Sequence, residues 1–285
     1  MNSSRAILGR GTAGPSDHVD EPADSRRCAD ACELAAARAL ENAGLDSHSA
    51  FDAVVVGLSG YDGTLHGTAP TFRSAHVRFV HDAPIALAGA IESRPAIVVI
   101  AGTGSVAYGE LADRTSVRVG GFGYLFGDDG SSFALARAAL SHAMAIDDRG
   151  ERSRIGEAAT AFFDVPNLRA LARAFYLREI DRPTLATFAR VVFDAARLGD
   201  SEANALLDDA ARALATLAAR ALERLHVASS MVPVAFIGGM VENPSLGERL
   251  RTHLSALAPR AVLAEPRESP AVGAALMALG DVAFA

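Results

Sequence analysis

Residues 120–132 read GGFGYLFGDDGSS, and this stretch decides how the rest of the sequence is interpreted. Its glycines leave backbone N–H groups bare, so that they can face a bound ligand, and two carboxylates, Asp128 and Asp129, stand beside them. A flexible linker is the alternative, but aromatic residues interleave with the glycines and argue against a solvated linker. The stretch therefore predicts a ligand-binding loop that leads into a helix.

Outward from this loop, strand and helix patterns alternate along most of the chain. Strands are expected at 53–58, 77–80, 96–100, 232–237 and 261–263, with a hairpin of 106–111 and 116–119. Helices are expected at 29–43, about 133–142, 155–163, 168–176, 184–198 and 201–225, with a last helix from Pro270. This alternation predicts an α/β architecture whose second half is rich in helices.

Glycines recur directly after the expected strands, where backbone N–H groups can face an anion. Residues 102–105 (GTGS) follow one strand and residues 238–239 (GG) follow another. Taken alone, residues 102–105 could equally form a tight turn. Residues 238–239 could equally mark the entry to a helix. A dinucleotide fingerprint is excluded because Ala107 occupies the position of its third glycine, and the chain has no G-x-x-x-x-G-K-[ST] loop.

Asp82 also stands at the end of an expected strand, where α/β proteins place their ligands. A carboxylate at such a position can take a proton from a substrate hydroxyl. Its place just before Ala83 and Pro84 is equally typical of a helix N-cap. Spacing alone leaves both interpretations open.

Composition excludes several classes of protein. The 285 residues carry 27 Lys and Arg against 34 Asp and Glu, and this net charge of −7 argues against a nucleic-acid partner. The length suggests roughly two domains, with the change expected near Pro95. The longest apolar stretches, 83–91 and 271–280, fall short of the ~18 to 20 residues that a membrane helix needs. The first residues show no apolar signal segment, so a cytoplasmic location is expected.

Cysteine and histidine give no metal site. Cys28 and Cys32 are the only cysteines, and their spacing in an expected helix could hold at most half of one. Two reduced thiols are therefore expected. The histidines show no ligand spacing, and no protein metal ligand is predicted.

Taken in order, the motifs resemble those of the N-acetylglucosamine kinases and their BadF/BadG/BcrA/BcrD-type ATPase relatives, within the superfamily of sugar kinases and actin. The likeness runs from about residue 7 to residue 279, and the GGFG and GDDGS pair is its most specific part. The motifs are LSG at 58–60, HDA at 81–83, GTGS at 102–105, GGFG at 120–123, GDDGS at 127–131 and GG at 238–239.

The resemblance implies two ribonuclease-H-like, actin-like ATPase domains with a cleft between them. The first would comprise residues 1–95, joined by a C-terminal helix at 270–285, and the second would comprise residues 96–269 with a helical insertion. ATP and Mg²⁺ would bind on one side, and the 6-hydroxyl of an amino sugar would be phosphorylated. Relatives often pair, so a homodimer is a candidate state.

On the nucleotide side, the resemblance implies that Gly102, Thr103, Gly104 and Ser105 form the second phosphate loop. Gly238 and Gly239 would lie beside the adenosine. Backbone amides and a metal ion suffice for much of this chemistry, since phosphoryl transfer depends mostly on positioning and on neutralising charge.

On the sugar side, the resemblance implies that Asp82 is the general base, with Thr103 near the sugar. Gly121, Phe122 and Asp128 would contact the sugar: Phe122 offers a face to a pyranose, and Asp128 accepts hydrogen bonds from sugar hydroxyls. Asp17 matches an Asn that touches the sugar in the family, and this substitution puts that contact in question. Whether N-acetylglucosamine or glucosamine is the substrate stays open.

One departure concerns the start of the chain. The family opens with an apolar strand and a first phosphate loop of the D-G-G-G-T type, whereas this sequence starts near the following hairpin, at residues 5–11 (RAILGRG). We therefore expect a start codon assigned too far downstream, weak ATP–Mg²⁺ binding and little kinase activity from the chain as written, and activity from a version extended upstream. Equal ADP release by the two versions would contradict this expectation.

Two other functions are weighed against the kinase. Some relatives activate radical dehydratases or reductases through an iron–sulfur cluster held by cysteines at a dimer interface, but the central region here has no cysteine. The other alternative is a non-catalytic, kinase-like protein that binds sugar without nucleotide. Calorimetry with both ligands separates it from a kinase.

Overall fold

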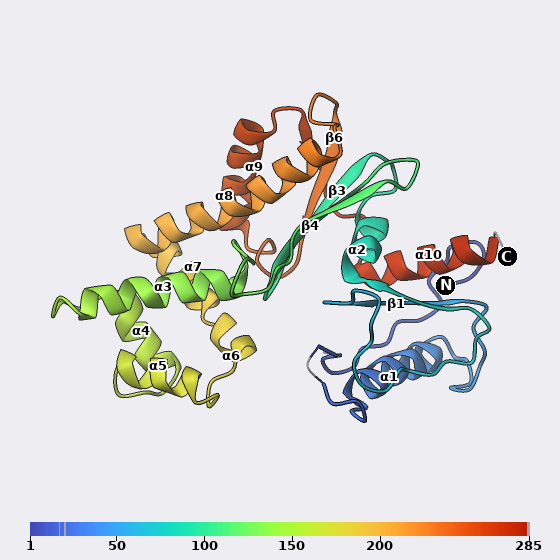
Figure 1. Ribbon diagram of the computed structural model, residues 1–285, viewed down its shortest axis with the longest axis horizontal. Coiled ribbons are helices and arrows are strands. Elements are labelled where there is room, and N and C mark those ends of the chain that lie inside the picture. The colour runs from blue at the N-terminus through green and yellow to red at the C-terminus, as the bar shows by residue number, and fades with distance from the viewer. Residues whose placement is uncertain (17, 20, 284–285) are drawn as a thin grey trace. The chain divides into compact units, whose positions relative to one another are not determined.

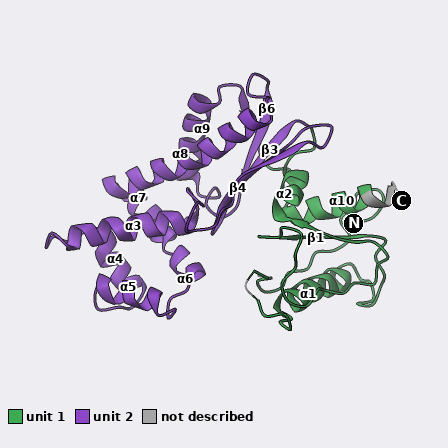
Figure 2. Ribbon diagram, viewed as in Figure 1, with its two compact units in different colours: residues 1–93, 266–285 green, residues 94–265 purple. Residues whose placement is uncertain are grey.

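The computed structural model describes residues 1–16, 18–19 and 21–283, and Figure 1 shows the order of its elements. The chain divides into two compact units, which are coloured separately in Figure 2. Unit 1 contains Met1–Ser93 and Pro266–Ala285, and unit 2 contains Arg94–Glu265. The sequence places the domain change near Pro95, which is the second residue of unit 2.

Unit 1 is built on a pair of parallel strands, β1 (Val54–Leu58) and β2 (Val77–His81), whose last residues are partners in the register. Helix α1 (Arg27–Asn42) contributes Cys28 to a small core with Val56 and Leu58. Helix α2 (Asp82–Ala90) begins directly after β2. The two strands therefore deliver their carboxyl ends, and the start of α2, to the same edge of this small sheet.

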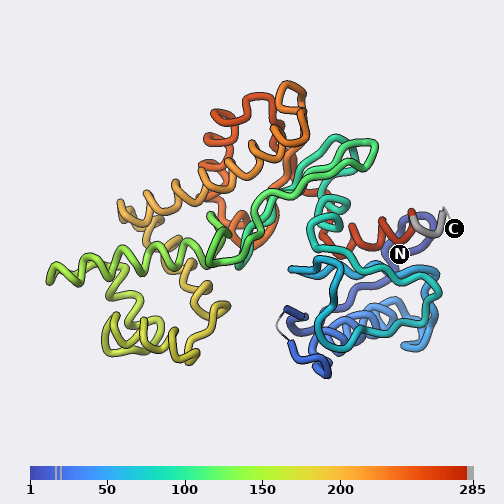
Figure 3. The backbone as a smooth tube through the Cα atoms, viewed as in Figure 1, coloured from blue at the N-terminus to red at the C-terminus, as the bar shows by residue number. Residues whose placement is uncertain are grey.

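The C-terminal helix α10 (Pro270–Ala283) packs against α2, so the two ends of the chain belong to one unit, as the tube in Figure 3 shows. Glycines let the two helices approach closely. A Cβ placed on Gly273 would lie 1.9 Å from the carbonyl oxygen of Ile85 and 2.5 Å from the backbone nitrogen of Gly89. The apolar sequence of α10 is therefore used for packing against α2.

Unit 2 is built on a five-stranded sheet in the order β5-β4-β3-β6-β7. Strands β3 (Ala96–Ala101) and β6 (Val232–Ile237) are parallel neighbours, and β7 (Ala261–Leu263) runs parallel to β6. Strands β4 (Ser105–Glu110) and β5 (Ser116–Gly120) form the expected hairpin. The continuous apolar sequence of β3 fits its central place, because such a strand is covered on both faces.

Helices supply most of the remaining core of unit 2. They are α3 (Ser132–Asp147), α4 (Arg154–Phe162), α5 (Leu168–Tyr176), α6 (Arg182–Ala186), α7 (Ala189–Arg197), α8 (Ser201–Arg224) and α9 (Pro244–Leu257). The apolar face of α8 is buried from Ala203 to Leu222, within one core that also includes the inner faces of α3 and the sheet. The predicted helix-rich second half is therefore one packed body.

One predicted helix is wrong in its extent. The apolar pattern at 184–198 suggests a continuous helix, but the chain forms α6 and α7 with a turn between them. At this turn the Phe188 N–H donates to the carbonyl of Leu185, three residues back, and the Thr187 hydroxyl donates to the carbonyl of Thr184. These tighter bonds compete with the helical pattern, as Thr side chains often do.

Within the part of the chain that the structure describes, no helix is both long enough and apolar enough to cross a membrane.

Candidate active site

Three glycine-containing segments of unit 2 meet at one edge of its sheet. Strands β3 and β6 are parallel and in register at Ile100 and Ile237, so the loops that follow them leave from the same edge. Strand β5 is antiparallel to β4, which is antiparallel to β3, so β5 also ends there, at Gly120. Ligands of α/β proteins bind beyond the carboxyl ends of strands, and this edge is therefore the candidate site in unit 2.

Hydrogen bonds tie the loop at 102–105 to the segment 120–132. The Ser132 N–H and hydroxyl both donate to the carbonyl of Gly102, at 2.9 and 3.1 Å. The Ser105 hydroxyl donates to the carbonyl of Asp129 at 2.8 Å. Thr103, at the tip of the loop, is exposed. The two segments that the sequence singles out thus form one structure, with Thr103 free to meet a ligand.

The two glycines after β6 have different structural surroundings. Gly238 has a φ of +104°, and a Cβ there would lie 2.5 Å from the carbonyl oxygen of Ala101. That carbonyl also accepts the N–H of Met240 at 3.1 Å. Gly239 is exposed and has nothing within 4 Å of such a Cβ. Gly238 is therefore needed by the backbone, whereas Gly239 leaves room for a ligand.

Asp128 is a buried carboxylate between these segments. Its residue is only 6% exposed, and its backbone has a φ of +61°. One oxygen, Oδ1, accepts the N–H of Ser105 at 3.3 Å, and the other, Oδ2, accepts a hydrogen bond from Arg182 at 2.9 Å. Gly104 permits this close approach, because a Cβ there would lie 2.8 Å from Oδ2. Asp128 thus connects its own loop to the loop at 102–105 through Oδ1 and to Arg182 of α6 through Oδ2.

Arg182 is the residue of this site that the sequence reasoning misses. It stands at the first position of α6, and its guanidinium carbon lies 5.0 Å from the ring centre of Tyr124 and 5.6 Å from that of Phe133. It also donates to the carbonyl of Thr103 at 3.4 Å. The sequence offers only a weak sign of this role. An arginine at a helix N-terminus is unfavourable, which suggests that an acidic or aromatic partner holds its side chain there.

The aromatic part of the loop faces solvent. Phe122 is 73% exposed, and the preceding Gly121 adopts a φ of +71° while its N–H donates to the carbonyl of Ser105 at 3.1 Å. Exposure of a large apolar ring is notable in a segment that is otherwise tied down by hydrogen bonds. The ring of Phe122 is therefore accessible from solvent.

In unit 1, Asp82 is the first residue of α2 and not its N-cap, which corrects one of the two interpretations of the sequence. The cap is His81, whose Nδ1 accepts the N–H of Ala83 at 3.1 Å. The same Nδ1 lies 2.7 Å from Oδ1 of Asp82. An Nδ1 that accepts an N–H has no proton to donate to Oδ1. Oδ1 is therefore without a hydrogen-bond partner among the described residues, and it is also buried.

The carboxyl end of β1 is held by a buried histidine. His18 is 1% exposed, and its Nε2 lies 3.1 Å from the carbonyl oxygen of Ser59, the residue that follows β1. Its ring also stacks on His66, with the ring centres 6.0 Å apart. The predicted sugar residue Asp17 lies outside the described residues.

Cysteine and metal chemistry have little support in the described residues. Among them, no group of three or more His, Cys, Asp or Glu side chains could hold a metal ion. Both cysteines are reduced. Burial, and secondarily the neighbouring Cys28, raises the pKa of the Cys32 thiol to about 12. The two cysteines therefore serve the packing of α1.

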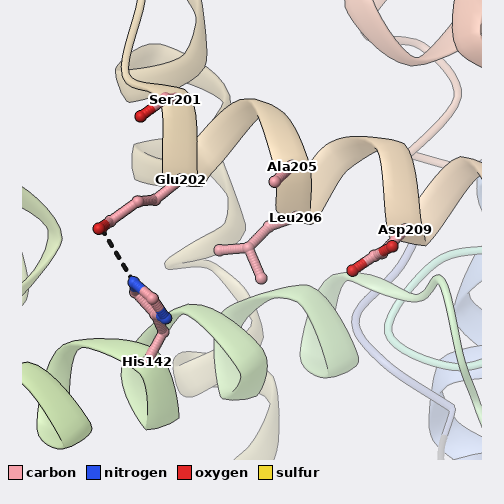
Figure 4. A pocket seen from close by; sticks show the side chains of 6 residues that line it. All are labelled: His142, Ser201, Glu202, Ala205, Leu206 and Asp209. Carbon is pink, nitrogen blue, oxygen red and sulfur yellow. Dashed lines mark ion pairs between the residues drawn. The ribbon is translucent and has the colours of Figure 1, made fainter.

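A separate hollow lies between α3 and α8 of unit 2. It is lined by His142, Ser201, Glu202, Ala205, Leu206 and Asp209 (Figure 4). An ion pair of 3.1 Å joins His142 Nε2 to Glu202 across it, and both side chains are more than 40% exposed. No glycine loop reaches this hollow, and its residues match none of the predicted site residues, so we assign it no chemistry.

Comparison with solved structures defines the class of protein. A protein from Chromobacterium violaceum, named provisionally as an N-acetylglucosamine kinase, is 29% identical and has a TM-score of 0.70, over 89% of this chain and 85% of its own. A ROK family glucokinase from Streptomyces griseus, solved with glucose and AMPPNP, has a TM-score of 0.54 at 16% identity, over 96% and 97% of the two chains. The fold is therefore that of the sugar kinases and actin-like ATPases, and the predicted fold class is confirmed.

Sequence comparison narrows the class to a family. The model of the BadF/BadG/BcrA/BcrD ATPase family matches residues 1–278, and the chain belongs to this family. It is 32% identical over 204 residues to an N-acetylmuramic acid/N-acetylglucosamine kinase from Clostridium acetobutylicum. The match covers 71% of this chain and 67% of that relative. The resemblance drawn from the motifs is thus confirmed.

Proposed function

We propose that the protein is an ATP-dependent amino-sugar kinase, which phosphorylates N-acetylglucosamine or glucosamine at the 6-hydroxyl. The observation that carries this proposal is the set of glycine loops gathered at one sheet edge in a member of this ATPase family. The name of the clostridial relative supports an amino sugar as the acceptor. The two compact units would correspond to the two ribonuclease-H-like domains.

Asp82 would act as the general base. The Asp82 side chain is 29% exposed, so the accessible part of its carboxylate can meet a sugar hydroxyl, whereas Oδ1 itself is buried beside His81. As the sugar O6 bonds to the γ-phosphorus, the bond from that phosphorus to the bridging oxygen breaks and leaves ADP. The proton of the hydroxyl passes to Asp82. The products are a sugar 6-phosphate, ADP and a proton.

The glycine loops would bind the nucleotide. Gly102, Thr103, Gly104 and Ser105 offer backbone N–H groups to phosphate oxygens, while Gly238 and Gly239 leave space beside the adenosine. Magnesium usually binds through one or two carboxylates together with substrate phosphates and water. The described residues contain no three-ligand metal cluster, and we propose that Mg²⁺ enters with ATP. When bound, it would neutralise phosphate charge.

The sugar would be recognised by residues from both glycine-rich segments of unit 2. Phe122 would stack on the apolar face of the pyranose, with Gly121 and Thr103 alongside. Asp128 keeps acceptor capacity beyond its two present bonds, because a carboxylate offers about four lone-pair sites. In unit 1, Asp17 would accept a sugar hydroxyl. A small sugar and ATP are the proposed partners, with a homodimer as the candidate assembly and the cytoplasm as the location.

Two measurements on the purified protein test the proposal. Calorimetry with N-acetylglucosamine and with glucosamine measures sugar binding without any need for turnover. A coupled assay of ADP release with the same sugars, compared with mannose and galactose, measures transfer. We expect the protein to bind an amino sugar, and the version extended upstream to release ADP in a manner that depends on that sugar. A protein that binds none of these sugars and releases no ADP with any of them would rule the proposal out.

A further inference from the structure

We propose that Arg182 is a positioning residue for sugar binding, which acts through Asp128 and the loop at 102–105. The inference rests on the proposed function, since it names a residue that this function needs. Arg182 lies 54 residues from Asp128 in the sequence and belongs to no motif of the site. Its contacts nevertheless connect every segment of unit 2 from which we draw sugar contacts.

Arg182 is the charged partner of Asp128. Asp128 is 6% exposed, and the burial of a carboxylate is costly unless the group is paired and hydrogen-bonded. Arg182 lies 2.9 Å from its Oδ2 and is its ion-pair partner within the part of the chain that the structure describes. The Ser105 N–H supplies the remaining direct bond, on Oδ1. Removal of Arg182 would leave the buried carboxylate with one neutral donor.

The geometry of the guanidinium is set by two aromatic rings. Tyr124 comes from the glycine-rich loop and Phe133 from the first turn of α3, and the guanidinium carbon lies 5.0 and 5.6 Å from their ring centres. The two rings meet edge to face, with centres 5.2 Å apart. A planar guanidinium stacks on such rings, whereas an ammonium lacks both the plane and the fork of donors. Lysine would therefore keep the charge of Arg182 but not its placement.

A second contact extends this arrangement to the other loop. The same terminal nitrogen that bonds Asp128 also donates to the Thr103 carbonyl at 3.4 Å. Meanwhile the Nε of Arg182 is buried without a partner among the described residues, which is unfavourable by itself. A side chain placed for stability alone would be expected to satisfy this donor. The arrangement instead favours a role in fixing the separation of the two loops.

The consequence is a defect in sugar binding with little change in chemistry. Asp82 belongs to the other unit, and no hydrogen bond, ion pair or ring contact among the described residues of unit 2 joins Arg182 to the glycine pair at 238–239. We therefore expect Arg182→Ala to raise the sugar Kd and KM about 10- to 100-fold, because a charge-assisted hydrogen-bond network is lost. The ATP KM and kcat at saturating sugar should change less than about threefold. Arg182→Lys should recover only part of the sugar affinity.

Arg190→Ala is the matched control. Arg190 is exposed on α7 and bonds only the nearby Thr187 carbonyl among the described residues. It should leave sugar affinity unchanged. Added guanidinium ion should restore part of the affinity to Arg182→Ala and none to the control, an effect that a purely structural role would not produce. Thermal melts identify any variant that fails to fold, and Arg182→Lys then carries the test.

A double-mutant cycle decides whether Arg182 acts through Asp128. If it does, Arg182→Ala combined with Asp128→Asn binds sugar about as weakly as the weaker single variant, because the two losses are not additive. Fully additive losses, or a folded Arg182→Ala with wild-type sugar affinity, would overturn the inference. Failure of the proposed function has a different signature, since the wild-type protein itself would then bind no amino sugar.

Discussion

The two units each present a carboxylate at a sheet edge, but they hold it in opposite ways. In unit 2, Asp128 is buried and both of its oxygens accept hydrogen bonds, from Arg182 and from the Ser105 N–H. In unit 1, Asp82 follows β2 directly, and its Oδ1 is buried with no hydrogen-bond donor among the described residues. Nδ1 of His81 lies 2.7 Å from that oxygen, but it accepts a hydrogen bond from the Ala83 N–H.

This difference separates a carboxylate that holds structure from one that is free to react. A general base needs an unoccupied lone pair within reach of the proton it removes. A carboxylate that positions a sugar or a loop benefits from fixed partners, because these lower the cost of its burial. The contrast supports the proposed roles, proton transfer for Asp82 and positioning for Asp128, and substitutions in each unit test this division.

The largest effect is expected at Asp82. Asp82→Asn keeps the size and the helical position of the side chain but removes the basic lone pair. We expect kcat to fall about 10²- to 10⁴-fold, the usual contribution of a general base, with the sugar Kd within about threefold of wild type. ADP-release kinetics and calorimetry measure the two quantities.

Asp24→Asn, at an exposed position of unit 1, is the control and should keep full activity. The division between the two carboxylates fails if Asp82→Asn loses sugar affinity while turnover at saturating sugar persists. In that case Asp82 would be a binding residue, like Asp128.

The next effect sharpens the distinction between structural and ligand-facing groups within unit 2. Gly238→Ala places a Cβ 2.5 Å from the Ala101 carbonyl at a φ of +104°, so we expect it to destabilise the fold by about 2 kcal/mol or more. A drop of roughly 4–8 °C in the melting temperature would follow. Gly239→Ala meets no atom within 4 Å and should melt like the wild type.

The same pair of variants also tests the proposed binding of ATP beside Gly239. If Gly239 lies beside the adenosine, its alanine variant raises the ATP KM without a change in melting temperature. Equal melting temperatures for the two variants would show that the close approach to Ala101 is relaxed in solution, and that the two glycines are structurally equivalent.

Much of this arrangement is predictable because it depends on local rules. The hairpin of β4 and β5, the buried β3 and the glycines after β3 and β6 all follow from alternation, apolar runs and turn residues. Strand direction then brings the glycine loops of unit 2 to one edge. The positions at which sequence and structure agree are those whose conformation depends on neighbours in the sequence.

The rest depends on contacts that no local pattern encodes. Arg182 reaches Asp128 only because α3 to α6 fold back on the glycine loop. No residue spacing in the sequence predicts this contact. His81 takes the N-cap of α2 in place of Asp82 because a histidine Nδ1 can accept an N–H as a carboxylate does. The turn at Thr187 and Phe188 likewise interrupts an apolar pattern that remains helical on both sides.

A smaller effect tests the exposed side of the unit 2 edge. Phe122 is 73% exposed, so Phe122→Ala should leave the melting temperature unchanged and weaken sugar binding about 2- to 10-fold, as expected for one aromatic contact. Phe126, in the same loop and 84% exposed, has no assigned role, and Phe126→Ala is the matched control. Calorimetry in which the two variants lose affinity equally would place the sugar elsewhere along the loop.

The smallest effect concerns the packing that supports Asp82. Cys28 joins β1 residues Val56 and Leu58 in the core beneath α1, and burial raises the pKa of the nearby Cys32 to about 12. Because only the thiolate reacts, roughly one molecule in 10⁴ is reactive at pH 8, and the folded protein should resist iodoacetamide at that pH. Denaturant should make both thiols react, and partial labelling should appear when α1 separates from β1. Rapid labelling of Cys32 in fully active protein would mean that α1 opens without disturbing Asp82, and that the reacting edge of unit 1 does not depend on this core.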